Sequence, residues 1–177
     1  LYHLSEAKKN TNADAIICVM SGNFVQRGGP AIIDKWKRTE MALNNGVDLI
    51  IELPTYYAVS SAEFFAKGSV SILHHLGVVN NLFFGSECGD VAKLTTLSKT
   101  LVNEDSKLKF LIKEHLAKGD TFAKAREKSL IEYLKDEDIN KIITSSNNIL
   151  GIEYIKSILR LNSNITPSTL KREGSNY

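Results

Sequence analysis

Three short polar segments carry residue types that suit the binding of a nucleotide or another anion. Residues 85–87 read Gly-Ser-Glu directly after an apolar run, and a glycine at that point lets a planar base approach the backbone closely. Residues 145–148 read Ser-Ser-Asn-Asn at the start of a helical pattern, where exposed N–H groups and the helix dipole attract an anion such as a triphosphate. Lys171 and Arg172 add two cations. Taken singly, a strand end, a helix cap and a solvated charge pair are the simpler explanations.

The polar segment 22–30, which contains three glycines and an arginine, is a fourth candidate. Arg27 could hold a phosphate or a carboxylate through two parallel hydrogen bonds, and Ser21 and Gln26 lie next to it in the sequence. No Lys-Ser or Lys-Thr follows Gly28, so the segment is not a Walker A loop, and its glycine spacing does not fit a dinucleotide fingerprint. A long turn with a solvated arginine is the alternative.

The histidines and cysteines do not indicate other chemistry. His74 and His75 fall near the C-terminal end of a helical pattern, where the helix dipole favours imidazole, and His115 fits a surface position on a helix. Cys18 and Cys88 have no partner at metal-binding spacing, which favours reduced thiols and a cytoplasmic protein. No Ser-His-Asp order, nucleophile elbow or paired-cysteine zinc pattern is present, so we predict no protein-held metal.

The elements that would position these segments alternate between strand and helix. Apolar runs of strand length cover 15–20, 48–53 and 78–84, and helical patterns fill 34–45 and 61–76 between them. This alternation predicts right-handed crossovers and a parallel sheet covered on both faces. We expect Trp36, Met41, Ala42 and Leu43 to join the core.

Helical patterns also flank this α/β alternation. Residues 1–9 read as the end of a helix, and the segment 90–143 shows only helical periodicity, over 92–102, 108–116 and 121–134. A last helix follows residues 145–148, and the tail 165–177 is expected to be extended or irregular.

Composition limits the class of protein. The chain has 177 residues, a net charge of +2 and 43% hydrophobic residues, which is the size and content of one ordinary domain. No apolar run approaches the length of a membrane span, so no membrane partner is expected. A charge near zero argues against a protein that coats polyanions. The sequence begins with Leu-Tyr-His-Leu rather than Met, and we expect further residues before it.

Six motifs follow one another along the chain. They are Ser-Gly-Asn-Phe-Val-Gln-Arg-Gly at 21–28, Lys-Trp-x-Arg-Thr at 35–39, Gly-Val-Asp-Leu-Ile-Ile-Glu-Leu-Pro at 46–54, Phe-Phe-Gly-Ser-Glu at 83–87, Asn-Asn-Ile-Leu-Gly at 147–151 and Leu-Lys-Arg at 170–172. In this order they resemble the motifs of one enzyme family, the bacterial tRNA(Met) cytidine acetate ligases of the nucleotidylyl transferase superfamily. The resemblance covers essentially the whole chain, and the ordered set is more specific than any single motif.

The resemblance implies an ATP-dependent ligase with a Rossmann-like parallel-sheet nucleotidyl transferase fold and a helical insertion or appendage. Such an enzyme forms acetyl-adenylate from acetate and ATP, with Mg²⁺, and acetylates N4 of the wobble cytidine in elongator tRNA(Met). Carried over by motif, the ATP-binding residues would be His3, Gly85, Asn147, Asn148, Lys171 and Arg172. Ser21, Gln26 and Arg27 are candidates for an acetate or tRNA loop.

The same resemblance predicts the division of the chain and leaves alternatives open. Residues 1–89 and 144–177 would form the α/β domain, with 90–143 as a helical segment packed on it. The family's first strand and its His-x-Gly-His motif would precede Leu1, and its C-terminal region would follow, so residues 1–177 alone are expected to bind ATP poorly or fail to turn over. Ser146 stands where the family often has proline, and serine also caps helices.

Two other functions fit the same residues. One is another adenylyltransferase of this fold, of the pantetheine-phosphate or nicotinate-nucleotide type, and the other is a non-catalytic nucleotide- or RNA-binding module. The residues that contact tRNA are left unassigned, and a homo-oligomer is left open as a partner.

Overall fold

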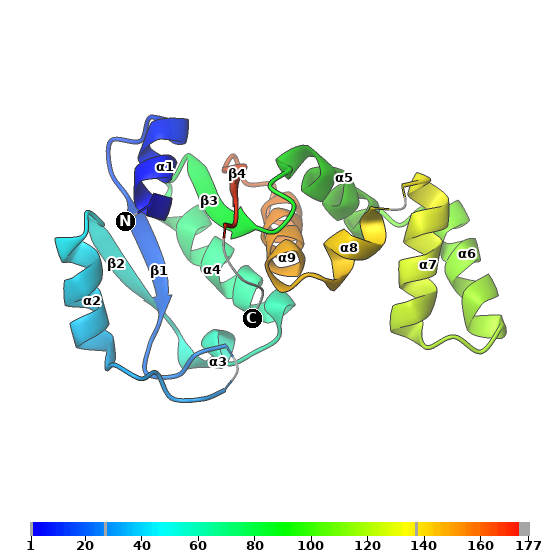
Figure 1. Ribbon diagram of the computed structural model, residues 1–177, viewed down its shortest axis with the longest axis horizontal. Coiled ribbons are helices and arrows are strands. Elements are labelled where there is room, and N and C mark those ends of the chain that lie inside the picture. Colours follow the sequence, from blue (N-terminus) through cyan, green and yellow to red (C-terminus); the bar gives the residue numbers. More distant parts are fainter. Residues whose placement is uncertain (1, 27, 137, 174–177) are drawn as a thin grey trace.

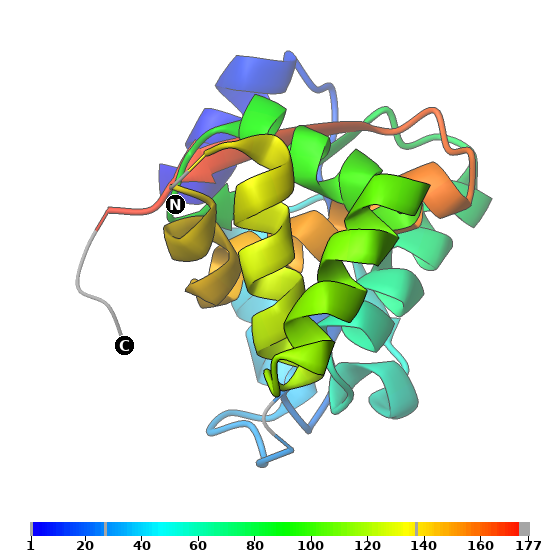
Figure 2. The same ribbon diagram turned by 90° about the vertical axis from the view of Figure 1, so that its right-hand side faces the viewer.

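The computed structural model describes residues 2–26, 28–136 and 138–173 and shows an elongated α/β protein (Figure 1). The strands occupy one part of the molecule and a group of helices extends from it, ending in a helical hairpin that faces the viewer in Figure 2. Within the described residues the elements are α1 (Tyr2–Thr11), β1 (Ile17–Ser21), α2 (Lys35–Asn44), β2 (Leu49–Leu53), α3 (Thr55–Ala58), α4 (Ala62–Leu76), β3 (Asn81–Ser86), α5 (Val91–Val102), α6 (Ser106–Ala117), α7 (Phe122–Leu134), α8 (Ile139–Thr144), α9 (Ser146–Arg160) and β4 (Thr166–Lys171).

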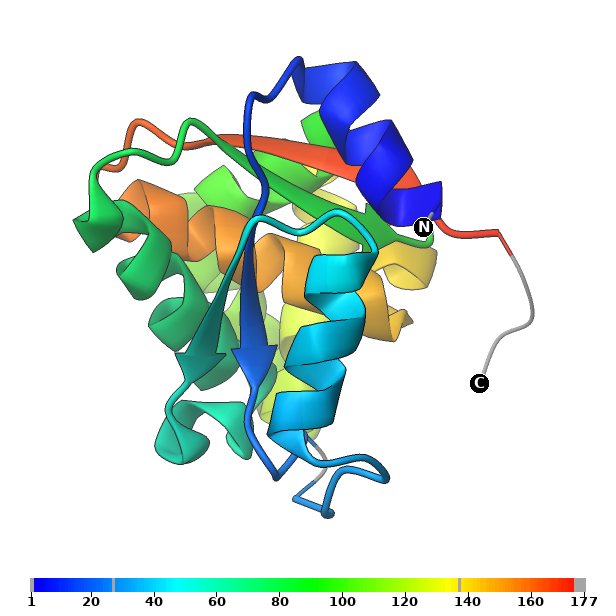
Figure 3. The same ribbon diagram turned by 90° about the vertical axis from the view of Figure 1, so that its left-hand side faces the viewer.

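The strands form two parallel pairs. β1 pairs with β2, with Ile17 opposite Leu49, and β3 pairs with β4, with Asn81 opposite Thr166. The predicted α/β class and the parallel pairing are therefore confirmed, and the tail predicted as extended or irregular contains the strand β4. The two pairs run in different directions, as Figure 3 shows, so their carboxyl ends form two separate corners of the molecule.

β1 and β3 are not hydrogen-bonded to each other, and a slot lies between the two pairs of strands. It has a volume of about 640 Å³ and is lined from one side by Cys18 of β1 and from the other by Phe83 of β3. Ala7 of α1, Leu73 of α4 and Tyr154 of α9 complete its wall. The sequence predicts one continuous sheet, whereas the structure has two separate pairs of strands.

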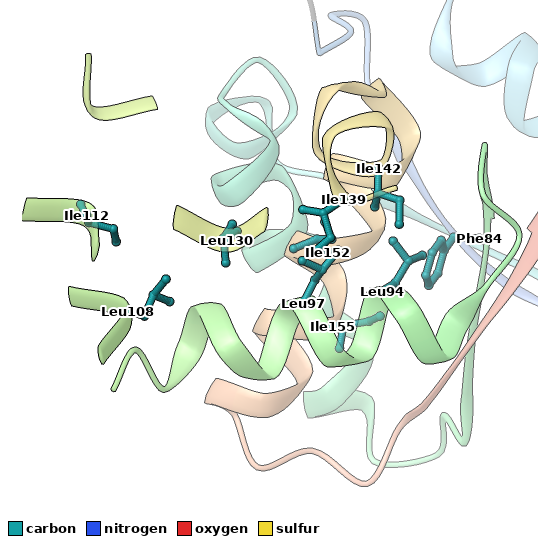
Figure 4. Close-up of a cluster of buried hydrophobic side chains, with 10 residues drawn as sticks. All are labelled: Phe84, Leu94, Leu97, Leu108, Ile112, Leu130, Ile139, Ile142, Ile152 and Ile155. Atoms are coloured by element: carbon teal, nitrogen blue, oxygen red, sulfur yellow. The ribbon is translucent and has the colours of Figure 1, made fainter. Parts of the chain in front are cut away.

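The helices after β3 share one hydrophobic core with that strand (Figure 4). α9 lies at its centre and packs against α4 on one side and α5 on the other. Carboxylates start two of these helices, because Asp90 accepts a hydrogen bond from Lys93 N–H and Asp105 accepts one from Leu108 N–H. The core residues are Phe84, Leu94, Leu97, Leu108, Ile112, Leu130, Ile139, Ile142, Ile152 and Ile155.

The core expected for the helix 34–45 is the clearest error of the sequence analysis. The helix itself is confirmed as α2, with Asp34 accepting a hydrogen bond from Lys37 N–H at its start. However, Trp36 is 74% exposed, Met41 and Leu43 are also exposed, and no residue of α2 is buried. Ala42 is half-buried.

Candidate functional site

The end of β3, the end of β4 and the start of α9 meet at one corner of the molecule. Ligands of open parallel sheets bind beyond the carboxyl ends of the strands, so this corner is a candidate site. Arg172 directly follows β4, and its backbone N–H donates to the carbonyl oxygen of Ser86 at 2.9 Å. This bond extends the β3–β4 pairing by one residue and holds Arg172 beside Asn147, the second residue of α9.

Gly85, Asn147 and Arg172, which the sequence analysis selected from three separate segments, are brought together here. The Arg172 guanidinium donates from Nη1 to Asn147 Oδ1 at 3.2 Å. A Cβ atom on Gly85 would lie 3.3 Å from Arg172 Cγ, so the missing side chain leaves room for the arginine to cross β3. Lys171 ends β4 opposite Ser86 and is exposed. The corner thus carries two cations next to an amide.

Glu87 occupies the start of α9, where we had expected exposed N–H groups. Its Oε1 accepts hydrogen bonds from Asn147 N–H at 3.1 Å and Asn147 Nδ2 at 2.7 Å, and its Oε2 accepts one from Asn148 N–H at 2.8 Å. Burial raises the pKa of Glu87, but these hydrogen bonds to its charged form outweigh burial and leave the pKa lowered. The expectation of open N–H groups at this helix start is therefore wrong for Asn147 and Asn148.

The side chain of Asn148 is buried, unlike that of Asn147. Its side chain is 2% exposed, and Oδ1 accepts a hydrogen bond from Cys88 N–H at 3.1 Å. The buried Ser86 hydroxyl accepts a hydrogen bond from Gly89 N–H at 3.0 Å. Asn148 and Ser86 thus hold the loop after β3, and a direct contact between the Asn148 side chain and a nucleotide stays a prediction that its burial does not favour.

A second corner lies at the ends of β1 and β2. Arg38 of α2 donates to the carbonyl oxygens of Ser21, Gly22 and Ile33, which fixes the start and the end of the loop after β1. Lys35 forms an ion pair of 2.7 Å with Glu52 of β2.

The loop candidates lie in or near this second corner. Ser21 ends β1, Gln26 is half-buried in the turn that the bridge between Phe24 and Pro30 closes, and Arg27 lies outside the described residues. No hydrogen bond or ion pair between described residues joins Ser21 or Gln26 to Asn147 or Arg172, so the structure does not combine the two groups of candidates.

His3 lies in α1 on the wall of the slot. Its ring meets that of Phe83 edge-on, with the centroids 5.2 Å apart. α1 starts on the side of the molecule toward which β3 and β4 point (Figure 3). His3 therefore faces the slot, and its role in nucleotide binding stays a prediction.

A cavity of about 300 Å³ adjoins the first corner, with Glu87, Lys93 and Asn148 in its lining. Lys93 there is paired with Asp138 at 3.2 Å and Asp136 at 3.6 Å. Among residues 2–26, 28–136 and 138–173, no three His, Cys, Asp or Glu side chains are grouped to hold a metal ion. In the same part of the chain, no helix is both long enough and apolar enough to cross a membrane.

The parallel strand pairs, with a polar corner at the end of β3, are those of an open parallel α/β protein. The family of HIGH nucleotidyl transferases matches residues 1–177, and the chain belongs to this family. The predicted nucleotidyl transferase fold is thereby confirmed.

Two relatives show which enzymes the chain resembles in sequence. The chain is 55% identical over 182 residues to a tRNA(Met) cytidine acetate ligase of Clostridium botulinum, covering 100% of this chain and 44% of that one. It is 54% identical to the enzyme of the same name from Clostridium novyi, with 100% and 44% covered. The resemblance to these ligases that the six motifs predict is confirmed. The chain spans less than half the length of these relatives.

A solved structure has the same fold. Thermotoga maritima TmcAL, crystallised with alpha-thio ATP, matches with a TM-score of 0.92 and 42% identity over 98% of this chain and 43% of that one. The bound nucleotide analogue belongs to that protein.

Two residues that organise these corners, Glu87 and Arg38, are not predicted from the sequence. Glu87 was visible in the Gly-Ser-Glu segment, but its pairing with a helix start 60 residues away has no local signal. Arg38 stands in the motif 35–39, yet nothing in the motif indicates that it binds the carbonyl oxygens of the β1 loop.

Proposed function

We propose that this chain is the nucleotide-activating part of a tRNA(Met) cytidine acetate ligase. The observation that carries the proposal is the whole-chain identity of 53–55% to enzymes of that name in three Clostridium species. The meeting of Gly85, Asn147 and Arg172 at one corner adds structural support, because three separate motifs converge there.

The proposed reaction has two steps. In the first, a carboxylate oxygen of acetate attacks the α-phosphorus of ATP, the bond to the β-phosphate breaks, and pyrophosphate leaves. In the second, N4 of the wobble cytidine of elongator tRNA(Met) attacks the acetyl carbon of acetyl-adenylate, AMP leaves, and N4 loses a proton. Catalysis of this kind depends on positioning and on stabilising the phosphate charge.

The residues at the β3–β4 corner suit the nucleotide in this scheme. Arg172 and Lys171 would offset the charge of the phosphates, and the Asn147 amide would hold a polar group of the nucleotide. Mg²⁺ is commonly bound through substrate phosphates with one or two carboxylates, so it would arrive with ATP rather than in a protein cage.

The slot between β1 and β3 would hold the family's first strand. Parallel strands lie about 4.8 Å apart, and one strand between β1 and β3 would pair with both and join the two halves into a single sheet. We propose that residues before Leu1 supply this strand and, at its end, the His-x-Gly-His motif. The division into an α/β domain of 1–89 and 144–177 with a helical segment 90–143 remains part of the same proposal.

The Cys18 thiol reports on the slot. Burial raises the pKa of Cys18, so alkylation, which requires the thiolate, should accelerate only at higher pH than for an ordinary cysteine. In the full-length protein a strand in the slot should cover Cys18, so its alkylation should be slower than in a protein of residues 1–177 alone. Mass spectrometry measures both rates. Equal rates in the two proteins would contradict the strand proposal.

Partners and location follow from the proposed reaction. The enzyme would act on acetate and elongator tRNA(Met) in the cytoplasm, where these substrates occur. A homo-oligomer of the enzyme stays a prediction.

The test uses the full-length protein with ATP, acetate and tRNA(Met). We expect acetate-dependent release of pyrophosphate and N4-acetylcytidine in the digested tRNA by mass spectrometry. ATP binding without either product would favour a non-catalytic nucleotide-binding module. Pyrophosphate release with a pantetheine or nicotinate nucleotide instead of acetate would favour another adenylyltransferase.

Arg172→Ala tests the nucleotide corner in the same protein. Losing one charged donor should raise the dissociation constant for ATP by about 10- to 100-fold in calorimetry. Arg160→Ala is the matched control, because Arg160 pairs with Glu63 at the opposite end of α9, about 20 Å away by helix rise, and it should leave the constant unchanged. An unchanged affinity for Arg172→Ala would rule out its proposed role.

A further inference from the structure

We propose that Glu87 is a positioning residue of the nucleotide site, acting through Asn147. Its carboxylate would fix the orientation of the Asn147 amide and, through that amide, the place of the Arg172 guanidinium. The inference rests on the proposed function, because it assumes that Asn147 and Arg172 meet the nucleotide. Glu87 itself need not touch the substrate.

Glu87 takes over the capping of α9 from outside the helix. Ser145, at the N-cap position, makes no side-chain hydrogen bond to the helix. Glu87 instead reaches from the end of β3 and accepts hydrogen bonds from the backbone N–H groups of Asn147 and Asn148. A carboxylate at this place also interacts favourably with the positive end of the helix dipole. The cap therefore ties the end of β3 to the start of α9.

The same carboxylate determines which way the Asn147 amide points. Nδ2 donates to Glu87 Oε1 at 2.7 Å, and Oδ1 accepts from Arg172 Nη1 at 3.2 Å. A flipped amide would place its oxygen against the carboxylate and its NH₂ group against the guanidinium, so both contacts would become repulsive. A negative group on one side and a positive group on the other thus select one orientation.

The hydrogen bonds of Glu87 also determine which groups of the protein are available to bind the phosphates. Both first-turn N–H groups bound by Glu87 are unavailable to an anion while the carboxylate holds them. The positive end of α9 is already offset by a negative charge, so we expect cationic side chains to bind the phosphates. Arg172, placed by Asn147, is the cation that the Glu87 contact helps to orient.

Glu87→Gln is the informative variant. Glutamine has the same shape but only one acceptor oxygen, and its NH₂ group would face N–H donors. The glutamine oxygen can face Asn147 or Asn148 but not both, so at least one hydrogen bond is lost, and the negative charge that selects the orientation of the Asn147 amide is removed. We expect the dissociation constant of ATP to rise about tenfold, the change that corresponds to one ordinary hydrogen bond.

The decisive measurement is a double-mutant cycle in the full-length protein. ATP affinity is measured by calorimetry for wild type, Glu87→Gln, Asn147→Ala and the double variant. If Glu87 acts through Asn147, Glu87→Gln should weaken binding in the wild-type background and have almost no effect in the Asn147→Ala background. Equal effects in both backgrounds would mean a general structural role and would overturn the proposal.

Asp105→Ala is the matched control for loss of a helix cap. Asp105 accepts a hydrogen bond from Leu108 N–H at 2.9 Å at the start of α6, in the helical hairpin away from the nucleotide corner. It should lower the melting temperature and leave ATP affinity unchanged. If it weakens ATP binding as much as Glu87→Gln does, the effect is one of stability and the proposal fails.

Failure of the proposed function gives a different pattern. If wild type binds ATP and the cycle shows coupling, the role of Glu87 stands even when no acetylcytidine forms. If the wild-type protein acetylates tRNA but the cycle shows no coupling, only the Glu87 proposal is wrong. If wild type does not bind ATP at all, both are wrong.

Discussion

Two regions of the molecule have similar elements but very different interiors. The β3–β4 region, defined here as β3, β4, α5 and α9, contains a helix with seven buried residues and a continuous core. The β1–β2 region, defined as residues 17–53, has a helix with none. Among its described residues only Gly22, Val47 and Leu53 are buried.

The difference arises from the elements that pack against the helix of each region. In the β3–β4 region α9 packs against β3, α4, α5 and α8, so its apolar side chains are covered on several sides. In the β1–β2 region α2 packs mainly on β2, and its inner face uses Arg38 and Lys35 for polar contacts with strand ends. We infer that most of the folding free energy resides in the β3–β4 region.

The largest contrast should come from leucine truncation in the two regions. Leu97 of α5 is 2% exposed in the core, so Leu97→Ala should lower the free energy of unfolding by about 2–5 kcal/mol. Leu43→Ala removes the same atoms from an exposed position on α2 and should change it by less than about 0.5 kcal/mol. Urea unfolding measures both. Similar losses for the two variants would contradict the division.

Adding a methyl group should give a smaller contrast of the same sign. A Cβ atom on Gly151 of α9 would lie 2.5 Å from the buried Phe84 ring, so Gly151→Ala should cost about 1–3 kcal/mol through overpacking. Gly29, in the loop of the β1–β2 region, has no neighbouring atom within 4 Å of such a Cβ. Gly29→Ala should therefore be nearly neutral in the same assay. A neutral Gly151→Ala would show that Phe84 can move.

The sequence predicted the elements better than their burial. Capping residues and stops are local, so α2 and α4 were placed within a residue or two from Asp34, Ser61 and Gly77. Whether an apolar helix face is covered depends on which elements pack against it, and no spacing in α2 contains that information. Trp36 was therefore misplaced in the core.

The candidate site shows the same division between local and long-range information. The sequence indicates three of the site candidates, Gly85, Asn147 and Arg172, because each lies in a distinct local motif. Their meeting depends on the pairing of β3 with β4, and the cap by Glu87 depends on a contact across 60 residues. Such contacts follow from tertiary structure, so residue types alone could not indicate that the start of α9 is filled.

The smallest expected effect is a pH dependence that distinguishes the two regions. The lowered pKa of Glu87 means that its charged form is stabilised in the folded state, so its contribution exists above the unfolded value of about 4.5 and is lost as the pH falls through the lower folded value. At neutral pH Glu87→Gln should cost about 1 kcal/mol, the ordinary contribution of a helix cap.

That cost should shrink in acid, because protonated Glu87 and glutamine then offer the same single carbonyl acceptor. Glu40→Gln is the comparison from the β1–β2 region, where the exposed pair of Glu40 and Lys37 should contribute less than about 0.5 kcal/mol at neutral pH. Urea unfolding from pH 7 to pH 3 measures both variants against wild type. A cost of Glu87→Gln that stays constant over this range would mean that the carboxylate charge does not stabilise the start of α9, and that the difference between glutamate and glutamine comes from hydrogen-bond geometry alone.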